Sequence, residues 1–417
     1  MSAELISILV LVVVFVIATT RSINMGALAF AAAFAVGELA ADLDADGIFA
    51  GFPGDLFVVL VGVTYLFAIA RANGTTDWLV HASIRLVRGR IALIPWVMFV
   101  ITGALTAIGA VSPAAVAIVA PIALSFAARY GISPLLMGAM VVHGAQGGGF
   151  SPISIYGSIV NGIVERENLP GNEVALFLAS LIANLIIAGI VFVLFGGLKL
   201  GGRDMVEESE SAAEDDESRL DPAKIATLAA LVALVVAVLG FDLDAGLSSI
   251  TLAVILSAFW PESSRRAVGE IAWSTVLLIC GVLTYVGVLE EMGTIKWAGE
   301  GVSDIGVPLL AAVLLCYIGA IISAFASSVG IMGALIPLAV PFLAQGEIGA
   351  VGMIAALAVS ATVVDVSPFS TNGALVLAAA PDVDRERFFR QLMVYGGIIV
   401  AVVPAAVWLV LVVPGFG

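Results

Sequence analysis

Two short stretches decide the fold that this sequence predicts: GGGFSPIS at residues 147–154 and VDVSPFSTN at residues 364–372. Each stretch places a proline beside glycines or hydroxyl residues inside a long apolar run. Proline removes a helical hydrogen bond, and such neighbours let the backbone unwind at a tolerable cost. Because unwound backbone survives at membrane depth only where it lines an enclosed cavity, the pair predicts two broken helices around one cavity. A simple proline kink at each position is the alternative.

The two stretches belong to halves of the chain that repeat each other. At an offset of 216 residues, the pattern Ser-Pro-x-Ser-x-x-Gly at 151–157 matches 367–373. The same offset aligns three further pairs: Ser112 with Ser328, Pro121 with Pro337, and Phe126 with Phe342. With a one-residue gap, the match extends upstream: Thr64, Gly74 and Trp78 align with Thr284, Gly293 and Trp297. A register of this length indicates an internal duplication.

Composition places the chain in a membrane. Of its 417 residues, 61% are hydrophobic and 12% are charged, which is too apolar for a soluble protein of this length. Apolar runs long enough for a core of about 30 Å predict ten crossings, near 4–20, 23–41, 55–72, 133–164, 173–198, 222–240, 246–260, 271–290, 347–380 and 391–413. The first run lacks the features of a cleaved signal, so it is expected to be a retained helix.

Two further apolar stretches are each interrupted midway, and we expect both to be re-entrant helical hairpins. They are 91–129, broken at Ser112-Pro113, and 307–345, broken at Ser327-Ser328. The predicted fold is therefore an all-α polytopic membrane protein with two repeats, 1–198 and 222–417, joined by an acidic linker at 199–221. Because each repeat has five crossings, an odd number, the second copy is expected to be inverted.

The distribution of basic residues tests this arrangement independently. If both termini lie outside, the cytoplasmic side receives fifteen of the seventeen basic residues: Arg21, Arg71, Arg85, Arg88, Arg90, Arg129, Lys199, Arg203, Arg219, Lys224, Arg265, Arg266, Arg385, Arg387 and Arg390. Only Arg166 and Lys296 remain outside, which agrees with the positive-inside rule. The stretch 76–88 is expected to be an interfacial helix. A net charge of −15 argues against nucleic acid as a partner.

Serines precede prolines where new half-helices are expected to begin. These cap and first positions are Ser112-Pro113, Ser151-Pro152 and Ser367-Pro368, with Ser328 alone at the second hairpin tip. Four N-termini meeting near the midplane would together supply about +2 of partial charge. A small dianion suits such a site. The alternative is that these serines only cap buried helix ends.

Three polar residues inside the broken crossings are candidates for ion chemistry. Asp365 adjoins the second break, and a carboxylate at membrane depth is expected to coordinate a cation or carry a proton. Its alternative is to cap a broken helix end. His143 and Gln146 precede the first break, and for His143 a proton-linked or substrate role competes with that of a hydrogen-bonded core residue.

These features together resemble a known group. Paired hairpins and broken helices, with the Gln146-to-Ser154 and Asp365-to-Gly373 segments as the specific parts, resemble the ion transporter superfamily that includes divalent anion–sodium symporters. Within it, the chain is most similar to the malonate and dicarboxylate carriers of the MatC type. The resemblance covers essentially the whole chain. It implies a multi-pass inner-membrane protein in contact with lipid, a homodimer, and an elevator-type mechanism.

The resemblance also implies functional residues. In those symporters a Ser-Asn-Thr triplet forms each hairpin tip, and a Thr-Pro-Pro-type turn lies in each broken helix; the tip asparagines are absent here. The expected substrate-binding set is Ser112, Pro113, Ser151, Pro152, Ser154, Ser327, Ser328, Ser367, Pro368, Ser370, Thr371 and Asn372. The expected coupling-ion set, for Na⁺ or H⁺, is Asp365, Gly147, Ser327 and Asn372.

The leading hypothesis is a cation-coupled dicarboxylate symporter that needs no cofactor beyond its coupling ion. A cation/proton or oxyanion exchanger of the same superfamily is the second, because Asp365 fits that work as well. An intramembrane hydrolase is the third. Since the sequence offers one deep Asp, one deep His and no H-E-x-x-H motif, we expect a transporter and not an enzyme.

Overall fold

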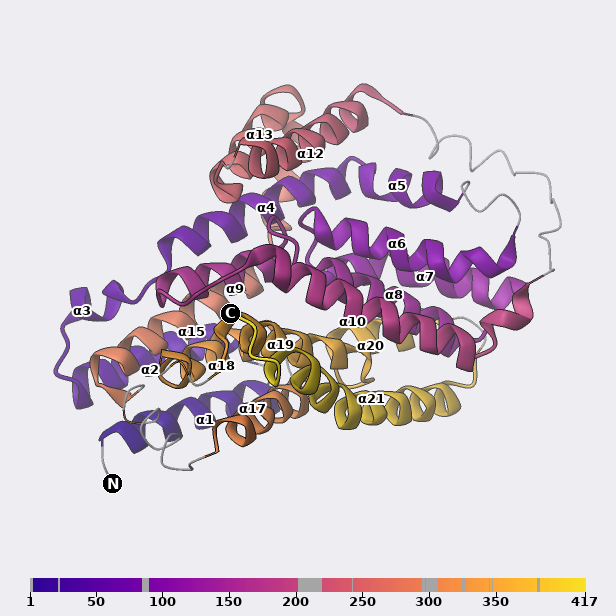
Figure 1. The fold of residues 1–417 in the computed structure, drawn as a ribbon. Coiled ribbons are helices and arrows are strands. Elements are labelled where there is room, and N and C mark those ends of the chain that lie inside the picture. The colour runs from indigo at the N-terminus through magenta and orange to yellow at the C-terminus, as the bar shows by residue number, and fades with distance from the viewer. Residues whose placement is uncertain are drawn as a thin grey trace.

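The structure, a computed structural model, describes residues 3–21, 23–84, 90–201, 220–241, 243–294, 297, 307–324, 328–344, 346, 348–380 and 383–417. Within these residues every secondary-structure element is helical (Figure 1). The all-α prediction is therefore confirmed.

The helices of the first repeat are α1 (Ala3–Arg21), α2 (Met25–Ala40), α3 (Ala45–Ala50), α4 (Gly54–Ala72), α5 (Thr75–Ile84), η2 (Ile91–Leu93), α6 (Ile94–Ala107), α7 (Ser112–Tyr130), α8 (Pro134–Gly148), α9 (Ile155–Arg166), α10 (Glu173–Leu194) and η3 (Gly197–Leu200). Those of the second are α12 (Pro222–Phe241), α13 (Ala245–Phe259), α14 (Pro261–Gly269), α15 (Trp273–Glu291), α17 (Pro308–Ser323), α18 (Ser328–Ala344), α19 (Ala350–Val363), η4 (Val364–Val366), α20 (Thr371–Ala379), α21 (Arg385–Val407) and η5 (Trp408–Val412).

Each of the ten predicted crossings corresponds to one of these helices or to a broken pair. Within the described residues, six segments are long and apolar enough to span a membrane: Gly54–Ala72, Ser112–Tyr130, Glu173–Leu194, Trp273–Glu291, Ala350–Ala379 and Arg385–Val412. The short helices α3 and α14 were not predicted. The predicted helix at 76–88 is α5, with 85–89 outside the described residues, and most of the predicted linker, 202–219, also lies outside them.

Both predicted hairpins and both breaks are present. Helices α6 and α7 pack together and turn at residues 108–111, where Gly109 adopts φ +118°, and α17 packs on α18 in the same way. Helix α8 stops at Gly148 and α9 resumes at Ile155, while α19 and α20 are separated by η4 and the turn after it. The chain therefore has two broken helices, each next to a hairpin.

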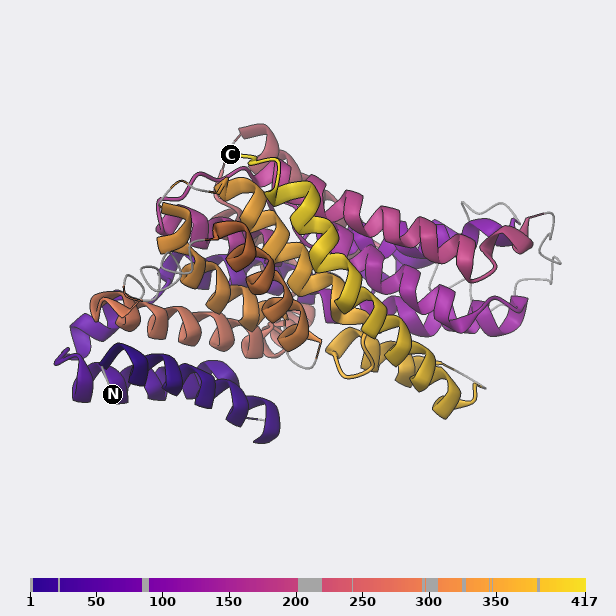
Figure 2. The same cartoon turned by 60° about the horizontal axis from the view of Figure 1, so that its bottom comes forward.

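The helices form two groups, which share a boundary. The frame consists of α1, α2, α4, α12, α13 and α15, and the bundle consists of α6 to α10 with α17 to α21. In Figure 1 the bundle helices α8, α10, α19 and α21 lie side by side, whereas α12 and α13 lie at the opposite edge of the molecule from α1. A second view shows α1 and α2 next to α15 (Figure 2).

Close helix packing at glycines joins frame helices of the two repeats. A Cβ atom at Gly26 of α2 would lie 1.8 Å from the carbonyl oxygen of Leu277 in α15, and one at Gly281 would lie 2.0 Å from that of Gly26. Helices α4 and α13 cross in the same manner, since a Cβ at Gly62 would lie 2.5 Å from the carbonyl oxygen of Gly246. Small residues let helix backbones approach closely in membranes. Each frame contact therefore joins one repeat to the other.

Candidate functional site

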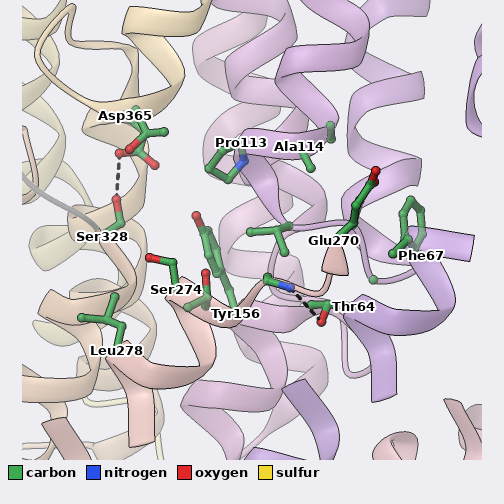
Figure 3. Close-up of a pocket in the computed structure, with 18 of the residues that line it drawn as sticks. Thr64, Phe67, Pro113, Ala114, Tyr156, Glu270, Ser274, Leu278, Ser328 and Asp365 are labelled. Carbon is green, nitrogen blue, oxygen red and sulfur yellow. Dashed lines mark hydrogen bonds between the residues drawn. The ribbon is translucent and has the colours of Figure 1, made fainter. Parts of the chain in front are cut away.

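A cavity of about 680 Å³ lies where the bundle meets the frame. Its lining includes the first turns of four helices: Pro113 and Ala114 of α7, Tyr156 of α9, Ser328 of α18 and Thr371 of α20 (Figure 3). The first turn of a helix has N–H groups without helical partners and the positive end of the helix dipole. Four such ends around one cavity make it a favourable place for an anion.

The serines that cap the two broken helices lie three residues later than predicted. The N-cap of α9 is Ser154, whose Oγ accepts from the Gly157 amide at 3.1 Å, and the N-cap of α20 is Ser370, bonded likewise to Gly373 at 3.4 Å. The prediction of caps at Ser151 and Ser367 is wrong, because the chain makes one further turn after each proline before helical geometry resumes. Ser112 is the first residue of α7 and not its cap.

Two glycines allow both turns to close. A Cβ at Gly157 would lie 2.0 Å from the carbonyl oxygen of Ser151, and a Cβ at Gly373 would lie 1.9 Å from that of Ser367. Only glycine permits so close an approach of helix and turn. The glycine that ends each repeated motif therefore has a structural reason, and it is the same reason in both halves.

Asp365 occupies the centre of a buried polar network that spans the two repeats. Its Oδ1 accepts from the Ser328 hydroxyl at 2.8 Å, and its Oδ2 accepts from Gln146 Nε2 at 2.7 Å and from Asn372 Nδ2 at 3.4 Å. Ser112 Oγ accepts from the same Asn372 nitrogen at 2.8 Å. Asp365 is 5% exposed and lines the cavity, so an ionisable group lies in the wall of that cavity.

Two amide oxygens of this network have no hydrogen-bond partner among the described residues. Gln146 and Asn372 are fully buried and use their nitrogens on Asp365 and Ser112, while Gln146 Oε1 and Asn372 Oδ1 accept no hydrogen bond among the described residues. An unpaired buried carbonyl costs about 1 to 3 kcal/mol. Rotation of either amide would place its oxygen next to the carboxylate, which would create an oxygen cluster suited to a cation.

Both ring nitrogens of His143 have hydrogen-bond partners. Asn184 donates to the Ser180 carbonyl at 2.9 Å, so its Oδ1 faces His143 Nδ1 at 2.9 Å and accepts from it. The other ring nitrogen, Nε2, lies 2.6 Å from the Tyr395 hydroxyl and accepts in turn. With both nitrogens partnered in the neutral ring, the geometry favours the hydrogen-bonded core residue over the proton-linked or substrate role.

The predicted site residues fall into three classes by position. Pro113, Ser328, Asp365 and Thr371 line the cavity, and Ser112, Gln146 and Asn372 lie directly behind it. The others face elsewhere: Ser151, Ser154, Ser367 and Ser370 bond backbone groups, Gly147 packs on Asn184, and Pro152 and Pro368 belong to the turns. Ser327 lies outside the described residues.

Sequence reasoning missed Tyr156, whose hydroxyl interacts with Ser112 and Gln146. A signal existed, because Tyr156 aligns with Asn372 at the 216-residue offset. It also missed Arg71 and Glu270, which line the mouth of the cavity. Neither lies in a motif, and only the packing of α4 against the turn before α15 brings them together.

Comparison with known proteins bears on these observations. Residues 1–149 match the family model described as "Dicarboxylate carrier protein MatC N-terminus", which confirms the predicted resemblance over that part of the chain. The structure of the Alcanivorax borkumensis YdaH transporter, described as having an unusual topology, superposes with a TM-score of 0.60 over 88% of this chain and 89% of that one. At 14% identity this likeness shows a common fold. A search of curated proteins gives no match.

Proposed function

We propose that this protein is a secondary active transporter that carries a small dicarboxylate, malonate or a C4 acid, in symport with a cation. The observation that carries the proposal is that residues from the first turns of four helices line one cavity. Each contributes roughly half a positive charge, which together suit the two carboxylates of a short diacid better than one. The matched family model for residues 1–149, named for a dicarboxylate carrier, supports the same substrate class.

Asp365 gives the proposal its coupling step. A dianion and an ionised carboxylate in one cavity repel each other, so binding of the anion favours neutralisation of Asp365 by a proton or by Na⁺. The unpaired oxygens of Gln146 and Asn372 favour a cation here, whereas Gly147 packs away from the network. Asp365 with Asn372 is therefore the core of the proposed coupling-ion site.

The two groups of helices support a proposal for alternating access. The frame is tied together by glycine contacts between repeats, while the bundle holds the four helix ends and the polar network. We propose that the bundle moves against the frame as an elevator, that the frame forms a homodimer interface, and that the inner membrane holds the protein with both termini outside. In that proposed orientation, the end of the cavity beside Arg71 faces the cytoplasm.

An uptake assay tests the function. Purified protein in liposomes, supplied with radiolabelled malonate, succinate, acetate or citrate, should accumulate the short diacids only under an imposed Na⁺ or proton gradient. Cation flux without any dicarboxylate would favour the exchanger, which Asp365 also fits. Equal uptake of acetate and malonate would contradict the substrate class.

Labelling of introduced cysteines tests the orientation. Cysteines at the exposed residues Gly171 and Leu243 should react with an impermeant reagent added outside, and one at Ser211 should react only from the cytoplasm. The native Cys280 and Cys316 are buried and should stay unlabelled. External labelling at Ser211 would overturn the inverted arrangement.

A further inference from the structure

An ion pair at the cavity mouth has no part in the transport site described above. Arg71, in the last turn of α4, pairs with Glu270, which lies just before α15, and both line the same cavity as Ser328 and Asp365. Arg71 Nε and Nη2 donate to Glu270 Oε2 at 3.1 and 2.5 Å. The two side chains are 39% and 46% exposed.

We propose that Arg71 is the docking residue for one carboxylate of a dicarboxylate that passes through this mouth, and that Glu270 occupies Arg71 when no anion is present. This inference rests on the proposed function, because the anion it names is the transported one. Glu270 acts as a built-in competitor for the arginine. Arg71 is thus a residue that sets affinity at one face of the membrane.

The pairing geometry leaves room for a second carboxylate. Both guanidinium donors converge on a single oxygen, so the pair is not the two-pronged arrangement in which each oxygen takes one N–H. Nη1 of Arg71 has no hydrogen-bond partner among the described residues. A planar guanidinium with a free edge can accept an incoming carboxylate before it releases the first.

The charge balance of the cavity favours such a residue. Among the described lining residues Arg71 is the sole basic side chain, whereas Glu270 and Asp365 are both acidic. An entering dianion that finds Arg71 fully paired meets two carboxylates and no free cation. When a substrate carboxylate replaces Glu270 on Arg71, the entering anion gains one attraction, and the released Glu270 side chain, 46% exposed, turns to solvent.

The ion pair is not needed to hold its two elements together. The Tyr65 hydroxyl of α4 already bonds Ser257 at 2.9 Å and Ser264 at 2.5 Å, and the Ala272 amide donates to Thr64 Oγ1 at 3.4 Å. Both partners belong to the frame or its connecting turn, so motion of the bundle does not require the pair to break. Exposed pairs contribute about 0 to 1 kcal/mol to stability, so variants should fold.

Helix α15, the second copy of α4 in the duplication, lacks an arginine equivalent to Arg71. Between the aligned pairs Thr64 with Thr284 and Gly74 with Gly293, the place of Arg71 is taken in α15 by Glu290 or Glu291. The proposed docking residue therefore exists at one mouth of the pathway. Variants of Arg71 and Glu270 should alter transport from the cytoplasmic face and leave transport from the outer face unchanged.

Titration calorimetry of the purified full chain with malonate measures the effect on binding. Glu270→Gln should tighten malonate binding about threefold to tenfold, and Arg71→Gln should weaken it by a similar factor. Matched controls are Glu262→Gln and Arg390→Gln, which make the same changes in net charge at exposed positions that do not line the cavity. In everted vesicles, Glu270→Gln should lower the KM for malonate, with Vmax unchanged or reduced by slower release.

The outcomes separate this inference from the proposed function. If the wild type binds malonate and Glu270→Gln binds it with the same Kd, the pair is structural only. The same conclusion holds if Glu270→Gln binds malonate more weakly, as Arg71→Gln is expected to do. If the two control variants change the Kd for malonate by the same factors, the effect comes from net charge alone, and this result also overturns the inference. Failure of every protein, wild type included, to bind a dicarboxylate would instead reject the proposed substrate, and the inference with it.

Discussion

The two hairpin and broken-helix modules share a backbone and differ in chemistry. Both use a glycine, Gly157 or Gly373, to close the turn, and both cap the second half-helix with a serine. At the 216-residue offset, however, Asp365 aligns with Gly149 and Asn372 aligns with Tyr156. Duplication thus preserved the parts that shape the cavity, while the charge at its centre belongs to the second module alone.

The position of the network shows how the modules depend on each other. Asp365 of the second module is held by Gln146 of the first, and Ser112 of the first by Asn372 of the second. Neither module has a satisfied polar centre without its partner. All of these residues lie in the bundle, so the network holds the two modules of the bundle together at the cavity.

The strongest test of the chemical difference is Asp365→Asn. It should abolish gradient-driven dicarboxylate uptake, because the ionisable group is lost. The asparagine still offers one oxygen to accept a hydrogen bond from Ser328 or Gln146, so the fold should be kept. Uptake in liposomes at several Na⁺ concentrations and pH values measures this, with thermal unfolding as the control for folding. Persistent concentrative uptake with the same ion dependence would make Asp365 a structural residue.

The backbone likeness predicts equal damage in both modules. Gly157→Ala and Gly373→Ala each place a Cβ about 2 Å from a turn carbonyl, so each should lower stability by about 3 kcal/mol. Thermal unfolding in detergent measures the loss. Gly189→Ala is the matched control, since nothing lies within 4 Å of its added Cβ. A large effect in one module only would mean that the two turns are not equivalent.

The two hairpin serines provide a finer comparison. Ser112→Ala and Ser328→Ala should each weaken malonate binding by about 1 kcal/mol, roughly fivefold, because each removes one hydrogen bond at the site. Only Ser328 bonds Asp365, so its variant should also change the cation dependence of binding. Titration of malonate at two Na⁺ concentrations distinguishes them. If neither substitution changes malonate binding, the helix ends do not form the anion site.

The smallest expected effect lies at the C-terminal end of α9. Burial, followed by the nearby Glu290, raises the pKa of Glu167 above its ordinary value, and Arg166 opposes the rise. Protonation therefore favours the folded state, and stability should increase as pH falls from neutral through the raised pKa. Glu167→Gln should raise Tm slightly at neutral pH, and the difference should vanish below about pH 4.5, the ordinary pKa. Glu165→Gln is an exposed control, and a pH-independent difference would contradict the assignment.

The sequence by itself determined the duplicated helical architecture. Apolar runs, prolines beside hydroxyl residues and the 216-residue register located the crossings, the hairpins and both breaks, because these features follow from local backbone chemistry and membrane thickness. They also identified Asp365, since a carboxylate within an apolar run is conspicuous. The cap serines were misplaced because the length of a turn after proline depends on what packs against it.

Only the tertiary structure decided which side chains meet. Gln146 and Asp365 are 219 residues apart, and their contact exists because α8 of the first broken helix packs against η4 of the second. The same holds for Arg71 and Glu270, which no motif links, and for His143, whose partners Asn184 and Tyr395 come from α10 and α21. Periodicity and composition report on one helix at a time, whereas a site between inverted repeats is set by how the helices pack.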